Sequence, residues 1–152
     1  MKTSGHYKLL RFIPALLIMG VIFFFSSQTG DESTAVSDEV IWATAGSDMV
    51  GSELVTVIVR KSAHFLEYAA LGAMVYFGLR GYGDEKRQGR KVGFSGLFGG
   101  LYAVTDELHQ YFVPGRACMV RDVLLDTCGA FFGAYAMYLL YRLIGRLVKN
   151  NK

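Results

Sequence analysis

The sequence predicts an all-α protein: a polytopic membrane protein folded as a four-transmembrane-helix bundle with a polar cluster at the outer leaflet. Three observations lead to this prediction: four long apolar runs, Lys and Arg residues that fall mostly on one side of them, and polar side chains that gather at one depth. The chain of 152 residues is short enough to form one domain over residues 1–152. Hydrophobic residues make up 52% and charged residues only 19%, which excludes a disordered chain.

The four apolar runs cover residues 9–26, 61–79, 92–113 and 122–144. Each approaches the roughly 20 helical residues that cross about 30 Å of hydrocarbon. The first is the most apolar and carries Pro14 near its start, where a helix tolerates proline. The second is polar in its first half, the third turns polar from Thr105, and the fourth is polar only at its beginning. A cleaved signal peptide is the alternative for the first run, but no small-x-small cleavage site follows it cleanly.

The distribution of basic residues predicts the orientation, because Lys and Arg in short loops stay on the cytoplasmic side. Twelve of the sixteen lie on one side of the four runs: Lys2, Lys8, Arg11, Arg80, Lys86, Arg87, Arg90, Lys91, Arg142, Arg146, Lys149 and Lys152. Residues 28–53 lie on the other side and carry several acidic residues but no Lys or Arg. We therefore expect both termini in the cytoplasm and residues 28–53 to form an outer loop, with Trp42 at the interface.

Polar side chains gather near the outer ends of three of the runs, where ionisable groups are costly and mark function. On the second helix, at 100° per residue, one face carries Arg60, Lys61, His64, Glu67 and Tyr68. The third helix ends with Asp106, Glu107, His109 and Gln110, and the fourth opens with Arg121, Asp122 and Asp126. A turn at Pro114 and Gly115 would place Arg116 above the acidic residues.

These residue types allow three kinds of site. Basic side chains would clamp a phosphate or carboxylate, and the candidate ligand-binding residues are Lys61, His64, Tyr68, Asp106, Glu107, Gln110, Arg116, Arg121, Asp122 and Asp126. General acid–base work on an ester or phosphoester would use His64, Glu67, Glu107 or His109. The third possibility is an ion-pair network that only fixes helix packing. No recognised zinc spacing occurs, so we expect neither a metal nor another cofactor.

Two further classes of interaction are not expected. Nucleic-acid binding is set aside, because topology and anionic inner-leaflet lipid account for the cytoplasmic basic residues. Cys118 and Cys128 lie too close along one segment to predict a structural disulfide.

Several motifs along the chain belong together. They are Ser26-Ser27-Gln28 with Ser33, Arg60-Lys61-Ser62-Ala63-His64-Phe65 with Glu67-Tyr68, and residues 105–116 followed by Arg121-Asp122, Asp126 and Gly129. Together they resemble the VanZ-like family of small bacterial membrane proteins, from about Leu9 to Leu143. The resemblance implies a four-helix membrane protein, and a named family member confers low-level resistance to teicoplanin, a lipoglycopeptide. It assigns no reaction to any residue, and the chain departs from the pattern at Cys118-Met119.

These observations predict a bacterial cell-envelope protein of the cell membrane that binds an anionic lipid or a lipid-linked cell-wall precursor at its extracellular face. Such a protein would lower the action of lipoglycopeptide antibiotics indirectly and confer low-level resistance to teicoplanin. One alternative is a membrane-embedded lipid-modifying hydrolase or transferase with Glu107 or His64 as acid–base group. The other is a structural or assembly protein without a ligand. The oligomeric state does not follow from the sequence.

Overall fold

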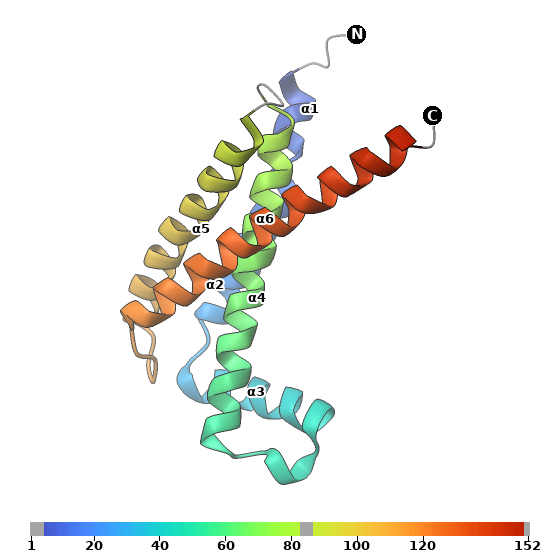
Figure 1. Cartoon of the computed structure of the whole chain (residues 1–152). Coiled ribbons are helices and arrows are strands. Elements are labelled where there is room, and N and C mark those ends of the chain that lie inside the picture. Colours follow the sequence, from blue (N-terminus) through green and yellow to red (C-terminus); the bar gives the residue numbers. More distant parts are fainter. Residues whose placement is uncertain (1–4, 83–86, 151–152) are drawn as a thin grey trace.

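The computed structural model describes residues 5–82 and 87–150, which fold almost entirely into α-helices (Figure 1). In chain order these are α1 (Gly5–Leu10), α2 (Ile13–Ser26), α3 (Gly30–Ala45), the 3-10 helix η1 (Ser47–Met49), α4 (Glu53–Arg80), α5 (Gln88–Gln110) and α6 (Val120–Asn150). No strand occurs in these two ranges, so the all-α prediction is confirmed. Lys2, Lys86 and Lys152, which contributed to the predicted orientation, lie outside the described residues.

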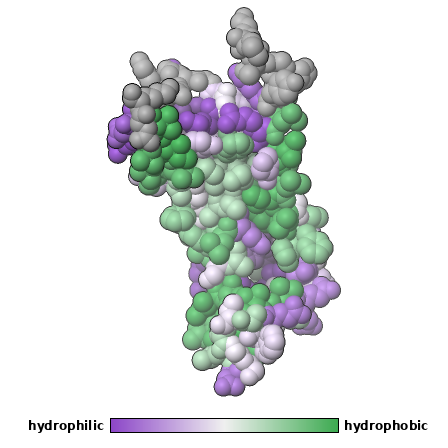
Figure 2. All heavy atoms as spheres, turned by 90° about the vertical axis from the view of Figure 1, so that its right-hand side faces the viewer, coloured by the Kyte–Doolittle hydropathy of each residue, from purple (hydrophilic) through white to green (hydrophobic). Residues whose placement is uncertain are grey.

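Two stretches of the described chain are long and apolar enough to cross a membrane, Lys8–Ser26 and Val120–Asn150. The helices α4 and α5 are long enough but not as apolar, because they carry the polar groups of the predicted cluster. The expectation of four spans is thus met by composition for two of them. The surface is strongly apolar: Leu17, Phe94 and Leu101 are 66%, 66% and 69% exposed. Figure 2 shows hydrophobic residues covering much of one face below a hydrophilic band.

The helix ends differ from the predicted ones for local reasons. The first helix is interrupted at Arg11 and Phe12, because Pro14 in the first turn of α2 cannot donate to the preceding turn. α4 begins at Glu53 instead of residue 61, since the apolar segment before Arg60 contains no helix breaker. α5 ends at Gln110 rather than 113, because the residue before Pro114 disfavours the helical conformation. α6 continues to Asn150.

The sequence predicted an outer loop over residues 28–53. The structure instead places the helix α3 within this segment. A capping box starts this helix: the Thr29 N–H donates to Glu32 Oε2 (2.8 Å), and the Glu32 N–H donates to Thr29 Oγ1 (3.3 Å). Ser37 and Ile41 are buried, and α3 packs against the N-terminal part of α4 (Figure 1). The prediction failed because α3 lies across the end of the bundle and needs only a narrow apolar stripe. Trp42 is exposed.

The core of the bundle lies where α6 crosses α4, which is the most extensive helix contact (Figure 1). Tyr68 and Leu71 of α4 and Ala130 of α6 are fully buried there. A Cβ atom on Gly133 would collide with the backbone carbonyl of Ala69, so the two helices approach as closely as glycine allows. This close approach fixes the height at which the polar ends of α4 and α6 meet.

Candidate functional site

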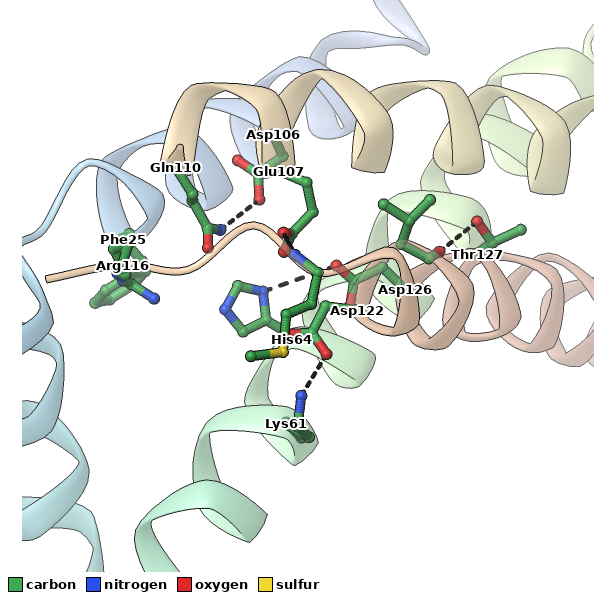
Figure 3. A network of polar contacts seen from close by, with 12 residues as sticks. Phe25, Lys61, His64, Asp106, Glu107, Gln110, Arg116, Asp122, Asp126 and Thr127 are labelled. Atoms are coloured by element: carbon green, nitrogen blue, oxygen red, sulfur yellow. Dashed lines mark hydrogen bonds and ion pairs between the residues drawn. The ribbon is translucent and has the colours of Figure 1, made fainter. Parts of the chain in front are cut away.

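The polar ends of α4, α5 and α6 converge around the connection between α5 and α6, residues 111–119 (Figure 3). The sequence predicted that these three helices would deliver their polar residues to one place. The structure brings most of them together, but it pairs them in specific ways that determine what each can do.

Lys61 of α4 forms an ion pair with Asp122 in the first turn of α6 (Figure 3). Both side chains are partly exposed, at 42% and 27%. The pair ties the start of α6 to the middle of α4. The two charges therefore neutralise each other. Lys61 already has an anionic partner in the protein.

One turn further along both helices, His64 of α4 faces Asp126 of α6 (Figure 3). The imidazole Nδ1 lies 4.0 Å from Asp126 Oδ2, too far for a hydrogen bond. The Asp126 side chain is 1% exposed, and neither of its oxygens has a hydrogen-bond partner. A buried polar atom without a hydrogen bond costs stability, so this arrangement calls for an explanation.

Two acidic residues of α5 are committed to local structure. Asp106 Oδ2 accepts a hydrogen bond of 3.1 Å from Gln110 Nε2, one turn along the same helix. Glu107 Oε2 accepts one of 2.9 Å from the backbone N–H of Met119, just before α6. Both carboxylates are buried. Glu107 therefore anchors the 111–119 connection.

Arg116, a predicted anion ligand, binds the end of α2. Its Nε donates to the Gln28 carbonyl (3.1 Å), and an Nη donates to the Phe25 carbonyl (2.9 Å). The Phe25 carbonyl also accepts the backbone N–H of Gln28 in the turn that ends α2, and the negative end of the helix dipole favours a cation there. Burial and the neighbouring Arg60 lower the pKa of Arg116, but a guanidinium stays protonated in proteins.

The same connection also touches the start of α3. The Gly30 N–H donates to the Pro114 carbonyl (3.0 Å), and a Cβ on Gly30 would collide with the Gly115 carbonyl. Gly115 has φ +74°, which favours glycine. The 111–119 connection therefore holds the junction between α2 and α3 through its backbone as well as through Arg116.

Two cavities flank His64 and share three lining residues, Arg60, His64 and Arg116. The first, of about 240 Å³, lies between α2, α3 and α4, and its lining combines polar residues with apolar ones such as Phe25 and Val40. The second, of about 330 Å³, is the more polar one. It is bounded by Lys61, Gln110, Arg121 and Asp122.

The remaining candidate residues lie at different places relative to the two cavities. His109 packs its ring on Phe23 of α2, with ring centres 4.8 Å apart, and lines neither cavity. Tyr68 is fully buried in the core, and its hydroxyl has no hydrogen-bond partner. Glu67 lines the first cavity, whereas Arg121 is exposed at the edge of the second. Within the two described ranges, no group of three His, Cys, Asp or Glu residues could hold a metal ion.

Arg60 is the residue that sequence reasoning left out of the candidate ligands. It lines both cavities and forms no ion pair or hydrogen bond with another described residue. Its position on the same face of α4 as His64 and Glu67 was the available signal. Ser33 and Ser37 of α3 also line the first cavity, and they were missed because α3 was expected to be a loop.

The whole sequence was compared with protein-family models, curated proteins and solved structures. No curated protein and no solved structure matches it. The model of one protein family, VanZ/LLP1, matches residues 12–144, which is most of the chain and includes every element of the site. The chain therefore belongs to the VanZ/LLP1 family, and its two apolar helical stretches agree with a membrane protein.

Proposed function

We propose that this protein crosses the cell membrane with α1–α2, α4, α5 and α6, keeps both termini in the cytoplasm, and places the polar site at the outer leaflet. The exposed large side chains of α4 and α5 include many apolar ones, such as Leu66 and Leu101, while Asp106, Glu107 and Gln110 are buried. α6 is about 46 Å long at 1.5 Å per residue, so its basic end would extend beyond the hydrocarbon. That end carries Arg142, Arg146 and Lys149, which favours the cytoplasm.

The function that this geometry supports best is binding of an anionic membrane lipid or a lipid-linked cell-wall precursor. The observation that carries the proposal is Arg60, whose side chain has no partner among the described residues and lines both a cavity with an apolar side at Phe25 and Val40 and a second, more polar cavity. A phosphate group would bind Arg60, while an apolar chain would lie along Phe25 and Val40. His64 and Gln110 line the polar side and would bind the rest of the headgroup.

A lipid-binding role would explain lipoglycopeptide resistance without direct contact between the protein and the antibiotic. Teicoplanin acts at the outer face of the membrane, and its lipid tail makes that action sensitive to the surface it meets. A protein that binds anionic lipids or precursors in the outer leaflet would change this surface. The antibiotic is therefore an indirect partner in the proposal, and the lipid is the direct one.

Native mass spectrometry of the purified protein tests the proposal, with titrations of phosphatidylglycerol and phosphatidylcholine. The wild type is expected to retain phosphatidylglycerol preferentially. Replacing Arg60 by Gln removes a hydrogen bond to a charged group, which is worth about 1.5–3 kcal/mol, so affinity should fall about 10- to 100-fold. Arg146→Gln is the matched control, because it makes the same charge change at an exposed position far along α6.

Equal retention of both lipids by the wild type would contradict the proposal. So would an Arg60→Gln variant that binds phosphatidylglycerol as tightly as the wild type. In either case the polar cluster would be left with a structural role, in which its ion pair and buried hydrogen bonds fix the packing of α4, α5 and α6.

A further inference from the structure

We propose that the site hydrolyses a phosphodiester bond of the lipid it binds, with His64 as the general base and Asp126 as its positioning residue. This inference rests on the proposed lipid-binding function and goes beyond it. It starts from a different observation, the arrangement of His64 and Asp126.

The pair has the layout of a base and a group that orients it. Asp126 is buried to 1% exposure, carries two oxygens without hydrogen bonds, and faces Nδ1 of His64 at 4.0 Å. The Nδ1 atom is itself buried without a partner. The ring's other nitrogen lies on the side away from Asp126 (Figure 3), and His64 lines both cavities. A carboxylate behind one imidazole nitrogen holds the ring and stabilises the imidazolium that forms when the other nitrogen takes a proton.

A purely structural role explains this arrangement less well. A structural pair would be expected at hydrogen-bond distance, because leaving buried polar atoms unpaired costs stability. Catalytic hydrogen bonds are often long in the free protein and shorten when substrate binds. Lys61 and Asp122, one turn away, already provide a direct link between the same two helices.

The proposed reaction places the lipid phosphate at Arg60, which lines both cavities together with His64. His64 Nε2 would accept a proton from a water molecule in the cavity, and the water oxygen would form a bond to phosphorus. The bond between phosphorus and the alcohol oxygen would break, and His64 would return the proton to that oxygen. The products are an alcohol and a phosphomonoester. Arg60 would stabilise the negative charge that gathers on the phosphoryl oxygens.

The test is turnover by the purified full-length protein in dodecyl maltoside, with phosphatidylglycerol in water labelled with a heavy oxygen isotope. The expected result is a phosphomonoester product that carries the heavy oxygen. Deacylated glycerophosphoglycerol serves as the soluble arm, and equal turnover of that compound would overturn the assignment to a lipid. Retained phosphatidylglycerol without labelled product would overturn the hydrolysis and leave the proposed binding function intact. Failure to retain the lipid at all would instead contradict the binding function.

Three variants assign the roles. His64→Asn is expected to lower kcat by about 100-fold or more, a larger loss than its loss of affinity for phosphatidylglycerol. Asp126→Asn should lower kcat but leave KM unchanged, since it acts through His64. His109→Asn is the matched control, because this histidine packs on Phe23 outside both cavities, and it should keep wild-type turnover. Full turnover in His64→Asn would overturn the proposal. The isotope result with the wild type decides the question if the variants fail to fold.

Discussion

The guanidinium of Arg116 donates a hydrogen bond of 2.9 Å to the carbonyl oxygen of Phe25, at the last turn of α2. The two residues lie on either side of the α3–α4 segment in the sequence, so this contact joins the N-terminal helix to the connection between α5 and α6. Gly30 and Pro114 make a second, backbone contact beside it. Arg116 and the contact between Gly30 and Pro114 therefore hold the end of α2 against the 111–119 connection.

Replacing Arg116 by Ala should destabilise the protein rather than only abolish ligand binding. The change removes two hydrogen bonds from a charged donor, each worth about 1.5–3 kcal/mol, and leaves the Phe25 carbonyl with only the backbone N–H of Gln28. The expected result is a lower melting temperature in detergent and lower abundance in the membrane. Arg121→Ala, a change at an exposed position, is the control. Normal abundance with complete loss of lipid binding would show instead that Arg116 acts on the ligand.

Replacing Gly133 by Ala should also destabilise the protein, although alanine is the better helix former by about 1 kcal/mol. The added Cβ would collide with the Ala69 carbonyl and push α6 away from α4, and overpacking of this kind costs about 1–3 kcal/mol. Gly145→Ala is the matched control, since a Cβ there meets no atom within 4 Å. Thermal unfolding of both variants checks the prediction. A melting temperature that does not fall in Gly133→Ala would mean that the two helices are less closely packed.

The proposed orientation predicts how the two cysteines react in whole cells. Cys118 is exposed in the 111–119 connection and should be labelled by a membrane-impermeant maleimide added outside. Cys128 is exposed on α6 but would face lipid, so it should stay unlabelled. Mass shift of the protein measures the reaction, and Cys118→Ser should remove it. Labelling of Cys118 only after the cells are lysed would reverse the orientation.

Expression in a susceptible Gram-positive host should raise the inhibitory concentration of teicoplanin more than that of vancomycin, because the proposed ligand lies in the lipid surface. Arg60→Gln should return teicoplanin susceptibility to the level of the empty vector. Arg146→Gln should behave like the wild type. Membrane abundance must be matched between variants. Equal effects on both antibiotics would point to a target other than the lipid surface.

The Lys61–Asp122 ion pair should contribute modestly to stability, since Lys61 is 42% exposed and solvent screens the interaction. A double-mutant cycle with Lys61→Met and Asp122→Asn should give a coupling of about 1 kcal/mol or less. Thermal unfolding measures the three variants against the wild type. A coupling near zero would show that the close approach of α4 and α6 alone sets their relative height.

The sequence by itself determined the all-α class, the apolar runs and the collection of polar residues at one end of three helices. These properties follow from periodicity and from the cost of placing charge in hydrocarbon, which act along each helix separately. The family was also visible in the sequence, because its motifs are local. The helix α3 was missed, since its stability depends on a capping box and on packing against α4 rather than on a strong apolar pattern.

Only the tertiary structure decided which polar residues pair with one another. Arg116 and Arg60 both line the two cavities, yet Arg116 binds the end of α2 while the Arg60 side chain has no partner among the described residues. His64 and His109 are separated in the same way, one facing Asp126 and the other packed on Phe23. The reason is that pairing depends on the relative height and rotation of α4, α5 and α6, and contacts such as that between Gly133 and Ala69 set these across long stretches of chain.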